Sequence, residues 1–147
     1  LSSVLKALQT GIAKGGATMR LVKFWHTADT SFLGLSAARL SGSGIGIGLQ
    51  AKGTAVIHHK SRRPHNNLEL FSNAPITTLG HYEKMAYNAA RYCQNELPDP
   101  VIVATKGEAL GARFHARVAL IYAIETSMTK DNALPELLDF SFLQAHP

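Results

Sequence analysis

The sequence predicts a three-layer α/β/α domain built on a mixed β-sheet, and three observations support this fold class. Helical and extended hydrophobic patterns alternate between residues 1 and 104. A glycine-rich segment at residues 40–59 predicts a β-hairpin, which requires an antiparallel pair of strands. The length of 147 residues is that of one domain. We therefore assign residues 1–147 to a single domain with helices on both faces of its sheet.

Three elements are predicted ahead of the hairpin. Leucine and isoleucine side chains at three- and four-residue spacing predict a first helix, which a serine at its start would cap and Gly15-Gly16 would end. An alternating hydrophobic pattern predicts a strand over residues 19–25. A short helix over residues 31–40 follows, and Asp29 precedes it at the position of a capping carboxylate. Capping is the simpler role for Asp29, with ligand binding as the alternative.

The hairpin has an unusual distribution of side chains. Glycine occupies positions 42, 44, 46 and 48, and Ile45, Ile47 and Leu49 alternate with the last three of them. Successive side chains of a strand point to opposite faces, so one face of this strand carries almost nothing. A bare face is tolerated where another backbone or a ligand comes very close. Lys52 lies at the hairpin tip and suits a flat or anionic ligand.

The second half of the chain gives weaker signals. A helix is predicted over residues 77–96, followed by a short extended piece at residues 101–104. Residues 114–125 fit either a strand or a helix, and we favour a strand because their hydrophobic side chains alternate. The tail after about residue 130 is predicted to be irregular, with at most one helical turn at Leu137-Leu138.

Residue chemistry alone predicts neither a catalytic nor a metal site. The glycine spacing does not match a dinucleotide-binding fingerprint, a P-loop or a nucleophile elbow. The seven histidines include no pair at the i, i+4 spacing of a helical zinc site, and one cysteine cannot complete a thiolate site. The carboxylates considered for acid–base chemistry are not paired on any local element; they are Asp29, Glu69, Glu83 and Glu125. These residues indicate a domain that holds a ligand.

Composition limits the partners and the compartment. The formal net charge is +5, but the only dense basic cluster lies between Lys60 and His65 in a proline-containing loop. This favours a solvated loop or an anionic ligand over a nucleic-acid surface. No segment approaches the ~18 apolar residues that span a bilayer, no signal peptide is recognisable, and the single Cys93 fits a reducing compartment. We expect a cytoplasmic protein with no membrane or nucleic-acid partner.

Several long strings carry a resemblance to a known family. They are LSGSGIGIGLQAKGTAVIH at residues 40–58, NLELFS at 67–72, NAAR at 88–91, TADTSF at 27–32 and FHAR at 114–117. In these strings the chain resembles the medium (β) subunit of adenosylcobalamin-dependent diol and glycerol dehydratases, over about residues 4–126. The resemblance implies the fold of the B12-dependent dehydratase-associated subunits. It also implies an α2β2γ2 enzyme that converts propanediol or glycerol to an aldehyde and water by a radical mechanism.

The resemblance implies a set of cofactor-binding residues and no catalytic or metal-ligating ones. The six residues that match the family's cobalamin contacts are Asp29, Lys52, Asn67, Leu68, Leu70 and Ser72. Lys52 would supply charge to the nucleotide phosphate or to a corrin amide, and Ser72 would bond the dimethylbenzimidazole region. Asp29 and Asn67 would bind amide side chains, while the leucines would wall the base. The bare hairpin would let backbone approach the corrin or its nucleotide tail.

The resemblance also implies partners, and the chain departs from the family in places. The large and small dehydratase subunits and a reactivating factor are the implied partners, in the cytoplasm or inside a bacterial microcompartment. The family has a strand ahead of the first helix, whereas this sequence starts at the helix, so we expect either a missing N-terminal strand or a differently completed sheet. The loop at residues 60–66 is more basic than in the family. The alternative assignment is the small subunit of the dehydratase-reactivating factor, which shares the fold but lacks the glycine-rich string.

Overall fold

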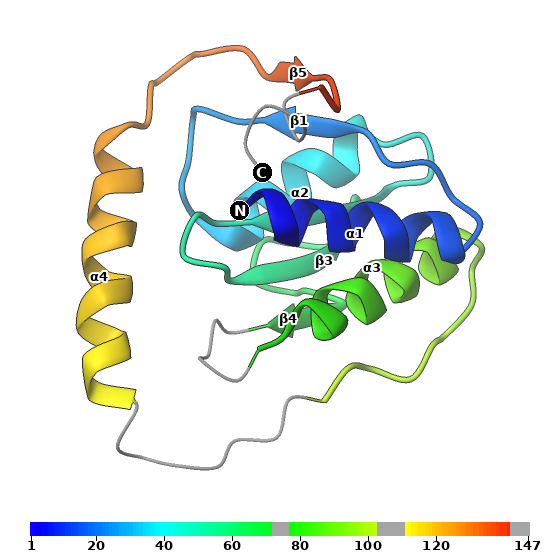
Figure 1. Cartoon of the computed structure of the whole chain (residues 1–147). Helices are drawn as coiled ribbons and strands as arrows, with labels where there is room; N and C mark the ends of the chain where they lie inside the picture. The colour runs from blue at the N-terminus through cyan, green and yellow to red at the C-terminus, as the bar shows by residue number, and fades with distance from the viewer. Residues whose placement is uncertain (72–76, 103–110, 142–147) are drawn as a thin grey trace.

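The computed structural model describes residues 1–71, 77–102 and 111–141 (Figure 1). In chain order its elements are α1 (Ser2–Lys14), β1 (Leu21–Lys23), α2 (Thr30–Leu40), β2 (Ile45–Leu49), β3 (Ala55–His59), β4 (Glu69–Phe71), α3 (Leu79–Cys93), α4 (Gly111–Ser127) and β5 (Glu136–Leu138). Among these helices, none is long and apolar enough to cross a bilayer.

The strands form two small antiparallel arrangements. β3 lies at the centre of a three-stranded sheet with β2 and β4 on either side, and β1 pairs separately with β5. The predicted α/β class is confirmed. Within the described residues, each strand pair is antiparallel, whereas the sequence predicts a mixed sheet that also contains parallel pairs.

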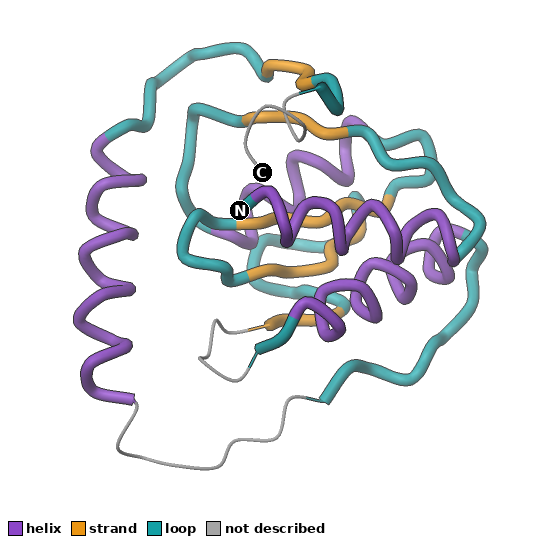
Figure 2. Tube along the Cα trace, in the orientation of Figure 1, coloured by secondary structure: helices purple, strands orange, loops and turns teal. Residues whose placement is uncertain are grey.

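Helices cover both faces of the three-stranded sheet (Figure 2). On one face α1 and α3 pack together, and Leu8 and Met85 join Ile57 of β3 in the main hydrophobic core. Ile57 and Met85 are fully buried. On the other face α2 lies against β2 and β3, where its Gly34 approaches Val56. The order helix, sheet, helix is the layering that the sequence predicts.

The bare face of β2 is covered by the backbone of α2. A Cβ atom added to Gly46 would lie 2.2 Å from the backbone nitrogen of Ala38. One added to Gly48 would lie 2.3 Å from the carbonyl oxygen of Thr30 and 2.4 Å from the nitrogen of Gly34. These distances are far shorter than any normal contact between such atoms, so only glycine fits at both positions. The sequence leaves open whether a ligand or another backbone approaches the bare face, and in the structure the backbone of α2 does so.

The segment at residues 114–125 is helical, so the strand predicted there is wrong. It lies within α4, which stands to one side of the sheet (Figure 1). An alternating pattern favours a strand only where a sheet buries one of its faces, and Leu120 and Ile124 are exposed here. Without that burial, alanine and leucine content favours the helix, which satisfies its backbone hydrogen bonds internally.

The C-terminal tail is more ordered than predicted. Residues 136–138 form β5 and pair with β1, with Leu137 opposite Val22, so the irregular tail with a helical turn at Leu137-Leu138 is wrong. Strand pairing here depends on a partner 115 residues away in sequence (Val22 to Leu137), which a local pattern does not reveal.

Helix boundaries agree approximately with the prediction. α1 starts at Ser2 with Leu1 as its N-cap residue and no side-chain cap, so the predicted serine cap is absent. α3 begins after Thr78, whose backbone N–H donates to Nδ1 of His81 at 2.9 Å, and it ends at Cys93. The predicted extended piece at residues 101–104 falls partly outside the described residues.

Replacing Gly48 with alanine should destabilise the fold. The added Cβ would overlap the backbone of α2, and overpacking of this kind typically costs about 1–3 kcal/mol or more. Gly42→Ala is the matched control, because a Cβ there meets no atom within 4 Å. Urea unfolding should show a lower midpoint for Gly48→Ala and little change for Gly42→Ala. Equal stability of the two variants would contradict the close packing of α2 on β2.

Candidate functional site

Asp29 caps the helix α2. Its Oδ1 accepts hydrogen bonds from the backbone N–H groups of Ser31 at 2.9 Å and Phe32 at 3.1 Å. The side chain is half-buried, and no described residue bonds its Oδ2. The capping role expected for Asp29 is confirmed, and among the described residues it uses Oδ1 alone.

Lys52 is held against α4. Its Nζ lies 4.8 Å from the centroid of the Tyr122 ring, a cation–π distance. The adjacent Ala51 N–H donates to both carboxylate oxygens of Glu125, at 3.0 and 3.2 Å. Burial raises the pKa of Glu125, and the Ala51 hydrogen bond and the Lys52 charge partly oppose that rise. The hairpin tip is therefore docked on α4 rather than free in solvent.

Asp29 and Lys52 lie at the same end of the sheet. Gln50, at the end of β2, donates from Nε2 to the carbonyl oxygen of Ala28, which immediately precedes Asp29. Lys52 follows two residues after Gln50. The structure thus places both residues at one end of the sheet, although a whole helix and a strand separate them in sequence.

The other predicted cofactor-binding residues lie in β4 or next to it in sequence. Leu70 is 59% exposed and pairs opposite Val56, so it points to the face that carries α2. Leu68 is half-buried and packs against the main core, so it offers less free surface than predicted. Oδ1 of Asn67 is buried and has no hydrogen-bond partner among the described residues. Ser72 lies outside the described residues.

An aromatic pair that sequence reasoning missed lies near Asp29. The rings of Phe32 and His65 meet edge to face, with their centroids 5.6 Å apart, and Phe32 is 43% exposed. This contact connects the first turn of α2 to the basic loop at residues 60–66. Phe32 belongs to the matching string at residues 27–32, and that string is the signal that could have identified it. The sequence places His65 in the basic cluster but does not indicate its contact with Phe32.

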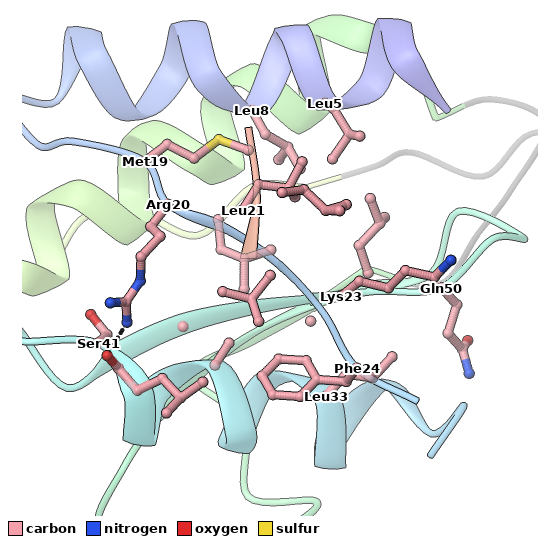
Figure 3. A pocket seen from close by; sticks show the side chains of 18 of the residues that line it. Leu5, Leu8, Met19, Arg20, Leu21, Lys23, Phe24, Leu33, Ser41 and Gln50 are labelled. Carbon is pink, nitrogen blue, oxygen red and sulfur yellow. Dashed lines mark hydrogen bonds between the residues drawn. The ribbon is translucent and has the colours of Figure 1, made fainter. Parts of the chain in front are cut away.

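A cavity of about 960 Å³ lies between β1 and β2 (Figure 3), and Gln50, Ala51 and Glu125 line one part of it. Leu5 and Leu8 of α1 enclose it on one side and Leu33 of α2 on the other. None of the described site residues predicted from the sequence lines this cavity. The described residues also contain no group of three or more histidine, cysteine, aspartate or glutamate side chains that would hold a metal ion.

The comparison with protein families assigns the chain. A family model described as "Dehydratase medium subunit" matches residues 1–99, which is more than half of the 147 residues. The chain belongs to the dehydratase medium subunit family. The resemblance seen in the sequence strings is thereby confirmed at the level of the family.

A solved structure described as "Glycerol dehydratase reactivase" has a similar fold. The TM-score is 0.58, the sequence identity is 19%, and the match covers 71% of this chain and 87% of that chain. At this identity the likeness shows the fold alone. It agrees with the expectation that a reactivating-factor subunit and a dehydratase medium subunit share one architecture.

Two of the matching strings build a buried polar cluster in this medium subunit. Glu69 of β4 is buried, and its Oε1 accepts from Nδ2 of Asn88 at 2.9 Å and from the Tyr92 hydroxyl at 3.1 Å. Its Oε2 accepts from the backbone N–H of Val101 at 3.3 Å. These bonds offset the cost of burying a carboxylate and hold β4 and its exposed Leu70 against α3. Part of the resemblance therefore reflects the support of the site and not contacts within it.

The Tyr92 hydroxyl should make stability depend on pH in the alkaline range. Burial, the Glu69 charge and the hydrogen bond to Glu69 raise the pKa of Tyr92 from 10.0 to about 12, while the Arg62 charge opposes the rise. A raised folded-state pKa contributes stability that is fully present below pH 10 and is lost as pH rises through about 12. Tyr92→Phe should therefore lose less stability than the wild type between these values in urea unfolding. Tyr82, whose pKa burial also raises, remains in both proteins as an internal reference.

Proposed function

We propose that this chain is the cobalamin-binding, non-catalytic subunit of a coenzyme B12-dependent dehydratase that converts 1,2-propanediol or glycerol to an aldehyde and water. The observation that carries the proposal is the match of residues 1–99 to the medium subunit family. In this role the chain binds and orients the cofactor, and the large subunit holds the substrate and the catalytic residues.

The chemistry of the residues at the sheet end and on β4 fits cobalamin. The cofactor carries neutral amide side chains, a phosphate and a flat benzimidazole base. Within the described part of the chain, Asn67 Oδ1 is a buried acceptor without a partner, suited to an amide N–H, and Asp29 offers a second acceptor in its Oδ2. The exposed Leu70 offers an apolar contact for a flat ring.

Lys52 is the residue we assign to the phosphate. In the free chain its ammonium group contacts Tyr122, an interaction worth about 0.5–1 kcal/mol at an exposed site. A hydrogen bond to a charged group contributes about 1.5–3 kcal/mol. Exchanging the ring for a phosphate is therefore favourable, and it would loosen one of the contacts between the hairpin tip and α4.

The bare hairpin strand needs a different role from the one implied by the resemblance. Its glycine face is filled by α2, so Gly46 and Gly48 do not offer backbone to the corrin. They fix the position of α2, and hence of Asp29 at its first turn. When bound, adenosylcobalamin supplies the radical through cleavage of its cobalt–carbon bond, and this chain's residues hold and orient it.

The proposal includes the partners and the compartment. We assign the chain to an α2β2γ2 complex with the large and small dehydratase subunits, serviced by a reactivating factor, in the cytoplasm or in a bacterial microcompartment. The alternative is the small subunit of the reactivating factor, which would have the same fold. A reactivating subunit would bind the large subunit transiently and would not remain in the active complex.

Co-expression tests the assembly. The chain should co-purify with the large and small subunits as one species on size exclusion, and this complex should convert propanediol or glycerol when adenosylcobalamin is added. The chain alone should give no turnover. Migration of the chain apart from an active complex of the other two subunits would contradict the medium-subunit role and favour the reactivating factor.

A substitution tests the phosphate contact. In the assembled complex, Lys52→Ala should weaken cobalamin retention by about 1–3 kcal/mol, as expected for loss of a charge-assisted bond. Lys6→Ala on α1 is the control, because Lys6 is exposed and lies outside the proposed site. Equilibrium dialysis of the three complexes measures the difference. Equal retention by wild type and Lys52→Ala would remove Lys52 from the site.

A further inference from the structure

Two helices hold the turn of the β2–β3 hairpin. From α3, the Tyr82 hydroxyl donates to the carbonyl oxygen of Gly53 at 2.5 Å. From α4, the Glu125 carboxylate accepts from the backbone N–H of Ala51. Figure 1 shows this turn at the end of the sheet that faces α4. Lys52 lies between the two bonded residues in sequence, so the position of its backbone depends on both helices.

Glu125 fixes the backbone next to Lys52 without neutralising the lysine charge. Both carboxylate oxygens accept from the single N–H of Ala51, at 3.0 and 3.2 Å. Neither of the ion pairs formed among the described residues includes Lys52. An anion that binds the ammonium group therefore has no described carboxylate to displace, although the residue before the lysine is firmly bonded.

Tyr122 contacts the other end of Lys52. The centroid of its ring lies 4.8 Å from Nζ, and a cation–π contact of this kind keeps the ammonium group over the ring. Tyr122 precedes Glu125 by three residues on α4, and residues three apart are neighbours on one face of a helix. One face of α4 therefore contacts both the backbone that leads into Lys52 and the end of its side chain.

Glu125 occupies a costly position on α4, outside the segment that matches the family model. Residues 1–99 match that model, whereas α4 spans Gly111–Ser127. Burial raises the pKa of Glu125, because a half-buried carboxylate is less well solvated than one in water. An apolar side chain would cover the hairpin tip without this cost. The hydrogen bond to Ala51 is therefore the feature that the carboxylate adds.

We propose that Glu125 is a positioning residue for Lys52, because its carboxylate fixes the hairpin tip so that the lysine ammonium group meets the phosphate of the bound cofactor. This inference rests on the proposed function, since it takes the nucleotide phosphate of cobalamin as the anion. Glu125 acts through the backbone of Ala51, and Tyr122 holds the ammonium group until the phosphate replaces the ring. α4 is thereby part of the support of the cofactor site.

Nuclear magnetic resonance of the chain tests the positioning without cofactor. The Lys52 side-chain protons next to Nζ should show an upfield ring-current shift from Tyr122 in the wild type. Glu125→Ala should lose this shift, whereas Glu125→Gln should keep most of it, because its amide oxygen can accept the same hydrogen bond. Glu96→Ala is the matched control, since that carboxylate pairs with Arg91 and not with the hairpin tip.

The assembled complex tests the effect on the cofactor. In equilibrium dialysis, Glu125→Ala should weaken cobalamin retention about tenfold, as expected when a charge-assisted hydrogen bond is lost. In a Lys52→Ala background the same substitution should change retention by less than about twofold, because no ammonium group is left to position. Glu125→Ala should also raise the adenosylcobalamin concentration that gives half-maximal turnover and leave the maximal rate unchanged.

Three results would count against the positioning role. An unchanged Lys52 shift in Glu125→Ala would mean that Glu125 does not place the lysine. Equal loss of retention with and without Lys52 would mean that Glu125 only stabilises the fold. A wild-type complex that retains no cobalamin would overturn the proposed function and the cofactor part of this inference together. The shift measured without cofactor separates that failure from a failure of the contact itself.

Discussion

The backbone contact between α2 and β2 is the constraint on which the rest of this structure depends. Gly46 and Gly48 let the helix lie directly on the strand, closer than any side chain would permit. This contact fixes where α2 begins, and with it the carboxylate of Asp29 and the ring of Phe32. Because α2 fills one face of the hairpin, the aliphatic face of β2 is left to meet the core formed by α1 and α3.

The candidate site is built around this contact from two directions. Gln50 ties the end of β2 to the loop before α2, which places Asp29 and Lys52 at one end of the sheet. On the far side of β3, the buried cluster around Glu69 holds β4 against α3 and leaves Leu70 exposed. An acceptor, a cation and an apolar surface are thus held by hydrogen bonds and packing between neighbouring elements.

Local signals in the sequence predict their elements, whereas elements that depend on distant partners are not predictable from it. The hairpin was predictable because glycines and aliphatic residues alternate over one strand, and the capping role of Asp29 because it depends only on the next three residues. The structure of residues 114–125 was not predictable, because their pattern fits a strand and a helix equally well. The helix forms because no sheet buries one face of this segment. β5 was missed because its partner strand β1 lies at the other end of the chain. Leu68 was placed in the site by its string, yet packing turns part of its surface to the core.

By itself, the sequence determined the α/β class, the hairpin with its bare face, and the family, since these depend on spacing and on residue identity. Only the tertiary structure decided what covers the bare face. A strand without side chains is equally suited to a ligand and to another backbone, and the choice depends on where α2 packs. The structure likewise decided that β5 pairs with β1, because strand pairing is a property of distant segments and not of either strand alone.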